Sequence, residues 1–136
     1  MFDLLWERHR RLLLVRFSDV LSTRDISDMD RAIVEFVGSH GRGDSIYDFS
    51  NVTAVAIPQS SFVSRRYDAP LTPGTVRILV SPQEELHQQC LEFARQQAQL
   101  GYKRPHVTRT LDEAFQILGV NRPVFEAVLP GSEPSR

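Results

Sequence analysis

The sequence is poor in cysteine and has no long hydrophobic run. Cys90 is the only cysteine among the 136 residues, so no disulfide can form within the chain, and this usage is typical of a reducing cytosol. No apolar stretch approaches the roughly 20 residues of a membrane-spanning helix. The N-terminus carries Asp3 and Glu7 and lacks the apolar core of a signal peptide. We therefore expect a cytoplasmic protein that does not span a membrane.

Neither sign of charge is in excess. The chain has 16 lysines and arginines against 17 aspartates and glutamates, which gives a formal net charge of −1. A protein that binds nucleic acid by neutralising phosphates normally carries a basic excess, so nucleic acid is not an expected partner. The one local basic cluster, residues 8–11, is interpreted as a solvated turn.

Familiar catalytic and metal-binding motifs are also missing. There is no Gly-x-Ser-x-Gly elbow, and the glycine-rich segment 38–43 follows a predicted helix, whereas a phosphate loop precedes one. The 4 histidines are scattered, and none has a His or Cys partner at a short spacing usable for a metal site. Asp48 is interpreted as an acceptor of backbone N–H groups in the turn after a strand, and Cys90 as a small buried hydrophobe. We expect neither an enzyme nor a cofactor.

The hydrophobic pattern alternates between strands and helices. Residues 2–21 contain two extended apolar runs around a polar centre, which predict a β-hairpin whose second strand is covered on both faces. An amphipathic helix follows over about residues 22–41, with Ser22 or Thr23 as its N-cap. Residues 44–49 then predict a buried strand.

The alternation continues in the second half of the chain. A short helix is predicted from Pro58 to about Tyr67, because proline suits the first position of a helix. Residues 75–80 predict the next strand. Ser81 and Glu84 then have the spacing of a capping box, which predicts that a helix begins directly after Ser81.

A last strand and a last helix complete the predicted domain. The strand is predicted over residues 104–110, and Thr110 with Glu113 forms a second capping box. Strands that alternate with helices of this length predict parallel strands joined by right-handed crossovers. We predict one α/β domain over residues 1–120, with a mostly parallel mixed sheet, an antiparallel N-terminal hairpin strand and about four helices. Residues 121–136 are predicted to be a partly disordered extension.

Residues 44–62 resemble a known family. Residues 46–53 read IYDFSNVT, which is similar to the central strand and turn of STAS domains, where a hydrophobic pair precedes Asp-Leu-Ser-Gly-Val-Thr. Residues 109–120, RTLDEAFQILGV, resemble the last helix of that family. In its order of elements over residues 2–120 the chain resembles the SpoIIAA-like bacterial proteins, a set also grouped with CRAL-TRIO lipid-binding domains. The resemblance implies a SpoIIAA-like fold and a regulatory role.

The resemblance also singles out the segment around Ile57. Anti-sigma-factor antagonists carry a phosphorylated serine at this position, and Ile57 has no hydroxyl, so the resemblance implies a domain without the serine phosphoswitch of the family. Ser60 and Ser61 lie three and four residues later, in the first turns of the predicted helix. A phosphate is favourable at a helix N-terminus. The alternative is that both hydroxyls satisfy free N–H groups of the first turn.

Two functions are open from the sequence. The first is a non-catalytic regulatory module that binds a partner protein through residues 56–61 and the helix after them. The second is a domain that binds a lipid or another small amphiphile between the helices starting at Pro58 and Pro82, with Arg65 and Arg66 as anion ligands. A homodimer through the edge of the first strand or an exposed helix is compatible with either. The candidate binding or modification residues are Ile57, Pro58, Gln59, Ser60, Ser61 and Arg65.

Overall fold

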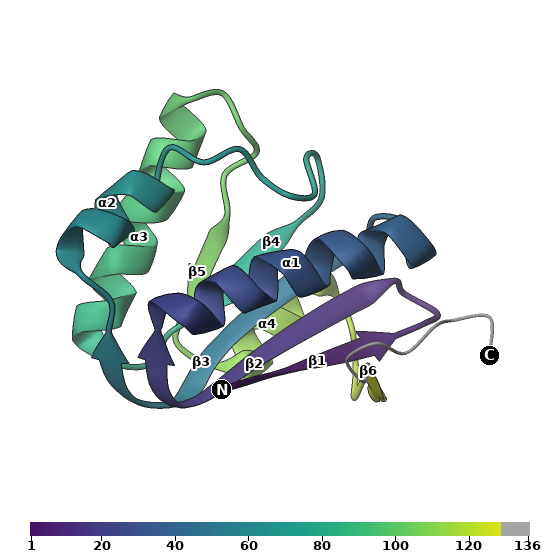
Figure 1. The fold of residues 1–136 in the computed structure, drawn as a ribbon. Coiled ribbons are helices and arrows are strands. Elements are labelled where there is room, and N and C mark those ends of the chain that lie inside the picture. Colours follow the sequence, from purple (N-terminus) through teal and green to yellow (C-terminus); the bar gives the residue numbers. More distant parts are fainter. Residues whose placement is uncertain (129–136) are drawn as a thin grey trace.

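Six strands form one mixed sheet in the computed structural model, which describes residues 1–128 (Figure 1). The strands are β1 (Phe2–Glu7), β2 (Leu12–Ser22), β3 (Asp44–Ala56), β4 (Arg77–Val80), β5 (His106–Thr108) and β6 (Glu126–Val128). Their order across the sheet is β5-β4-β3-β2-β1-β6. Strands β2 to β5 are parallel, and β1 is antiparallel to both of its neighbours. The predicted α/β class and the antiparallel hairpin are therefore confirmed.

Four helices cover the two faces of the sheet unequally. They are α1 (Thr23–His40), α2 (Gln59–Arg65), α3 (Glu84–Gln99) and α4 (Leu111–Leu118). From β2 to β5 the chain moves one strand at a time in one direction, so crossovers of the same hand place α1, α2 and α3 on one face. The connection from β5 to β6 runs back across the sheet, which places α4 on the opposite face (Figure 1).

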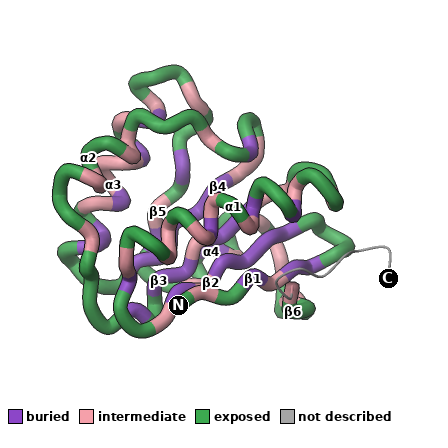
Figure 2. Tube along the Cα trace, in the orientation of Figure 1, coloured by how far each residue is buried: buried purple, intermediate pink, exposed green. Residues whose placement is uncertain are grey.

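The core has two layers that β2 separates. Leu13, Val15 and Phe17 point toward α1, α2 and α3, whereas Leu12 and Leu14 point toward α4. All five side chains are buried, and Figure 2 shows the burial concentrated in the central strands. A strand with both faces covered has no polar alternation. The continuous apolar run of β2 is explained in this way.

The hairpin turn between β1 and β2 uses side chains in place of the usual Asn-Gly pair. The carboxylate of Glu7 accepts hydrogen bonds from two backbone N–H groups of the turn, at 3.0 and 2.9 Å. Arg11 takes the left-handed conformation, with φ of 54°. Its guanidinium donates hydrogen bonds to the carbonyl oxygens of His40, the last residue of α1, and of Arg42, two residues later. Part of the basic cluster thus has a structural role, because it satisfies carbonyl groups at a helix end.

Two of the three predicted N-caps are confirmed. Ser22 and Thr110 are the N-caps of α1 and α4, and each forms a reciprocal capping box. The capping box predicted at Ser81 is wrong, because the N-cap of α3 is Gln83. The backbone N–H of Ser81 donates to a carbonyl oxygen at the end of β5 at 2.9 Å, which keeps this residue aligned with the sheet. Its buried hydroxyl lies 3.1 Å from Nδ1 of His87.

Strand β3 is longer than predicted. The sequence placed its end near residue 49, but β3 continues to Ala56 and pairs with β2 along most of its length. Between the pairs at Asp48 and Asn51, two residues of β3 oppose one residue of β2, which is the pattern of a β-bulge. Asp48 accepts the backbone N–H of Ser50 at 3.0 Å, as predicted, but it does so within a strand and not in a turn.

The end of the described chain adds a strand that the sequence pattern did not predict. Strand β6 pairs with Leu4–Trp6 of β1, so this part of the β1 edge is not free for dimerisation. Three residues are too short for a hydrophobic period to be recognised. The remaining part of the predicted C-terminal extension, residues 129–136, lies outside the described residues.

One glycine inside α1 and one shortly after it provide a matched test of the fold. A Cβ on Gly43 would lie 2.1 Å from the carbonyl oxygen of Arg11, whereas a Cβ on Gly38, inside α1, would meet nothing within 4 Å. We expect Gly43→Ala to lower the free energy of unfolding by about 1–3 kcal/mol. Gly38→Ala should raise it by about 0.5–1 kcal/mol, because alanine favours the helix. Urea unfolding of both variants measures this difference, and equal stabilities would contradict the close approach at Gly43.

Candidate functional site

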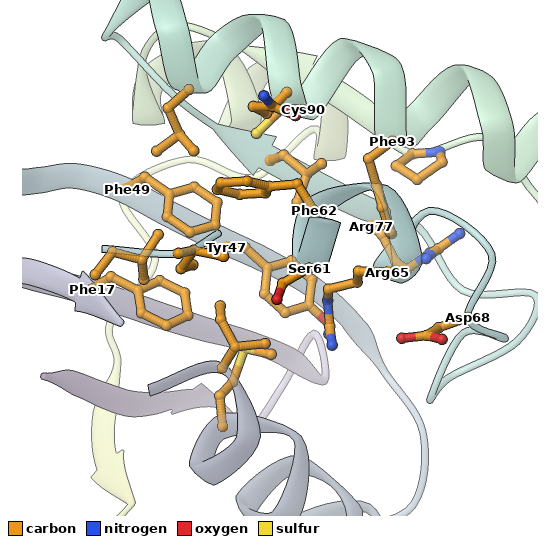
Figure 3. Close-up of a pocket in the computed structure, with 18 of the residues that line it drawn as sticks. Phe17, Tyr47, Phe49, Ser61, Phe62, Arg65, Asp68, Arg77, Cys90 and Phe93 are labelled. Carbon is orange, nitrogen blue, oxygen red and sulfur yellow. The ribbon is translucent and has the colours of Figure 1, made fainter. Parts of the chain in front are cut away.

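An apolar pocket of about 160 Å³ lies between the sheet and the helices α1, α2 and α3 (Figure 3). Its walls come from strands β2, β3 and β4 and from all three helices. Most of the side chains that face it are aromatic or aliphatic, and they include Phe17, Met29, Phe49, Phe62, Leu86 and Phe93. Such a mainly hydrophobic wall with few polar groups is the usual composition of a small-molecule site.

Two stacked phenylalanines form part of the sheet side of the pocket. Phe17 of β2 and Phe49 of β3 have ring centroids 4.9 Å apart and an angle of 5° between their planes. The β-bulge of β3 lies between Asp48 and Asn51 and therefore includes Phe49. Because the extra residue shifts the alternation of the strand, Phe49 and Val52 both belong to the core layer beneath the helices. The bulge therefore adds Val52 to this core layer, although Val52 does not line the pocket.

Polar contacts hold α2 over the pocket from two sides. The guanidinium of Arg65 donates two hydrogen bonds of 2.8 Å to the carboxylate of Asp30 on α1. On the other side, Oε1 of Gln59 accepts a hydrogen bond of 2.8 Å from Gln89 on α3. None of the seven residues of α2 is fully buried. Helix α2 is thus attached through polar side chains at its surface and through Phe62, which packs against the core, and it has the position of a lid.

The pocket has one polar side. Figure 3 shows Arg65, Asp68 and Arg77 on the side opposite the two stacked phenylalanines. Tyr47 of β3 also lines the pocket, and burial raises the pKa of its phenol. The phenol therefore keeps its proton at neutral pH and can donate a hydrogen bond. The pocket is amphipathic, with charged groups at one side and aromatic rings at the other.

The structure separates the residues that the sequence singled out into two groups. The N-terminus of α2 has no side-chain cap in the described structure, so the serines are not observed to satisfy its free N–H groups. Arg66 does not line the pocket, and its guanidinium donates to Gln89. Among the six candidate residues, Ile57, Ser61 and Arg65 line the pocket, whereas Pro58, Gln59 and Ser60 do not.

Sequence reasoning missed Arg77, the first residue of β4. It lies in the segment TVRILV, where an arginine interrupts an otherwise apolar strand. Its side chain lines the pocket, and the residue is only 7 % exposed. A charged side chain is rarely buried without a specific partner. An arginine inside a predicted buried strand was therefore the signal that could have identified it.

Other polar clusters lack the features of a reactive site. Ser81 and His87 form a buried pair, but Ser81 has 0 % exposure, so no substrate can reach its hydroxyl. Within residues 1–128 no group of three His, Cys, Asp or Glu side chains is placed to hold a metal ion. None of the helices in this range is long and apolar enough to cross a membrane.

Comparison with known proteins adds no relative. No protein-family model matches this sequence, and a search of curated proteins finds no significant match. The resemblance to STAS domains therefore stays a prediction, carried by residues 44–62, residues 109–120 and the order of the elements.

The single thiol offers a direct test of how closed the pocket is. Cys90 of α3 lines the pocket, and burial raises the pKa of its thiol from 9.0 to about 11. A rise of this size lowers the thiolate fraction at neutral pH by about 100-fold. We expect iodoacetamide to modify native Cys90 at pH 7.5 at least about 100-fold more slowly than the urea-unfolded chain. The rate should keep rising up to a pH of about 11.

A second variant serves as the control for this measurement. Ser60 is exposed and outside the pocket, so Ser60→Cys in a Cys90→Ala background should react at the rate of an ordinary thiol. If native Cys90 reacts as fast as this control, its thiol is open to solvent and its assignment as a buried side chain of the pocket wall is wrong.

Proposed function

We infer that this domain is a non-catalytic module that binds a small amphiphilic molecule in the pocket beneath α2. The observation that carries this proposal is the pocket itself, with its aromatic walls, its polar side and its covering helix. Preformed apolar pockets with a few convergent polar groups are the most frequent sites for small ligands. Protein cores contain few spaces larger than a water molecule, so a space of this size is unusual in a well-packed core.

The size of the pocket limits the ligand. Its volume of about 160 Å³ is close to that of an engineered cavity of about 150 Å³ that stays free of water and binds benzene. It is smaller than the about 300–1,000 Å³ of sites for drug-sized molecules. The expected ligand therefore has one ring or a short aliphatic chain. A long-chain lipid would fit only if α2 moved away.

The attachment of α2 limits ligand exchange. The carboxylate of Asp30 and the guanidinium of Arg65 are both about one-third exposed, at 31 % and 34 %. Exposed ion pairs typically contribute about 0.2–1 kcal/mol, and a pair with two hydrogen bonds such as this one contributes more than most. Outward movement of α2 would have to break this pair and uncover Phe62, which packs against the core.

A protein-interaction function is the second candidate, and exposed apolar residues favour it. Val20, Val55 and Val63 are 48 %, 40 % and 38 % exposed, and they lie near the ends of β2 and β3 and on α2. These elements border the segment 57–61 (Figure 1). The two functions are compatible, since a ligand that changes the position of α2 would also change this surface. The STAS resemblance supports such a regulatory role.

An apolar probe tests the ligand-binding proposal. We expect toluene to bind and to shift the amide resonances of residues on β3, α2 and α3 in an NMR titration. Cys90→Leu places extra carbon atoms inside the pocket and should weaken binding at least about tenfold, which corresponds to about 1.4 kcal/mol. Cys90→Ala removes volume at the same position and should keep binding. If wild type shows no shifts, or if Cys90→Leu binds as wild type does, the proposal is wrong.

A charge in the first turn of α2 tests the interaction proposal. Ser61 faces the space between α2 and the sheet, so Ser61→Asp should displace α2 and reduce the binding of a regulatory partner. Affinity capture from the source cells with wild type and with Ser61→Asp measures this. The exposed neighbour provides the control, since Ser60→Asp adds the same charge outside the pocket. Partners that bind all three proteins equally would contradict a role for this segment.

A further inference from the structure

We propose that the ligand of this pocket is a small carboxylic acid, bound as its anion with the carboxylate on the guanidinium of Arg77. This inference rests on the proposed function, because it names the class of molecule that the pocket takes. The evidence is a difference between two arginines on the same side of the pocket. Arg65 has a carboxylate partner within the protein, whereas Arg77 has none in residues 1–128.

Arg77 has only neutral acceptors within residues 1–128. One terminal nitrogen, NH2, donates to Oε1 of Gln97 at 3.1 Å and to the carbonyl oxygen of Lys103 at 3.0 Å. No carboxylate in the described part of the chain forms an ion pair with it. A guanidinium has five N–H groups. The Nε–H and the second terminal nitrogen are therefore left for a further acceptor, in the paired geometry that suits a carboxylate.

A buried charge without a counter-charge is costly. Arg77 is 93 % removed from solvent, since its exposed fraction is 7 %. Burial lowers the pKa of its guanidinium, which shows that the surroundings disfavour the charged form. An arginine nevertheless stays charged at neutral pH. The uncompensated charge therefore lowers the stability of the fold, and an anionic ligand would supply the missing negative charge.

Arg65, in contrast to Arg77, has a negatively charged partner. Its guanidinium is bound by both oxygens of Asp30, at 2.8 Å each. The pair leaves no net charge on this part of α2. Of the two arginines that line the pocket, only Arg77 therefore requires a negative group from elsewhere.

The contacts around Arg77 hold its side chain in place before a ligand arrives. Gln97 is fully buried; its amide nitrogen donates to the carbonyl oxygens of Arg66 and Asp68 while its oxygen accepts from Arg77. The guanidinium carbon of Arg77 lies 5.8 Å from the ring centroid of Phe93. A side chain fixed in this way loses little freedom on binding, which favours affinity. We assign Gln97 as the positioning residue for Arg77.

The position of Asp68 limits the charge of the ligand. Its exposed carboxylate lies on the same side of the pocket as Arg77 (Figure 3). It would repel any anion, and it would repel a doubly charged group such as a phosphate monoester more strongly than a carboxylate. A single unpaired arginine on the same side of the pocket as an acidic residue thus matches a ligand with one negative charge.

Benzoate and benzamide test the inference on the unmodified protein. They have nearly the same shape, and only benzoate is charged, so isothermal titration compares the charge alone. We expect benzoate to bind at least about tenfold more tightly than benzamide. Arg77→Gln should remove this preference. Arg31→Gln changes the net charge equally at an exposed position of α1 and should keep it.

Each remaining outcome decides the question. Asp68→Asn should tighten the binding of benzoate and leave that of benzamide unchanged, so the inference is testable even if Arg77→Gln fails to fold. Equal affinities of benzoate and benzamide would overturn the carboxylate assignment while the pocket function stands. The same holds if toluene binds and benzoate does not. If toluene, benzoate and benzamide all fail to bind, the proposed function itself is wrong.

Discussion

The hand of the crossover connections is the constraint on which the candidate site depends. It places α1, α2 and α3 side by side on one face of the sheet, although these helices have very different lengths. Helix α1 has 18 residues and α3 has 16, whereas α2, between them, has 7. A helix of that length spans only about 10 Å. It cannot fill the space between its neighbours, and the pocket is what is left beneath it.

The polar groups around the pocket distinguish it from a simple packing defect and are the reason for proposing a function for it. A cavity in a core reduces stability, and a buried arginine without a carboxylate reduces it further. Both features occur at one place, and the fold adds Gln97 to hold Arg77 in position. Costs of this kind are typical of functional sites. Binding of an anion with an apolar body would offset both, because it fills the space and neutralises the charge.

Much of the fold was predictable from local patterns, whereas only three of the six candidate site residues, Ile57, Ser61 and Arg65, line the pocket. The alternating strands and helices and the capping boxes at Ser22 and Thr110 depend on neighbours in the sequence. The missed features depend on contacts between distant segments. The backbone N–H of Ser81 is hydrogen-bonded to β5. The bulge in β3 depends on the pairing of β3 with β2. The pocket likewise arises from the packing of three helices, which no single segment encodes.

A crystal structure determined under xenon pressure would test the central claim most directly, because xenon enters apolar cavities of this size without needing a charged group. We expect xenon between the sheet and α2, in contact with Phe49, Phe62 and Leu86, with α2 in its present position. If α2 instead lies on the sheet with no xenon beneath it, the pocket does not exist and the proposed function is wrong.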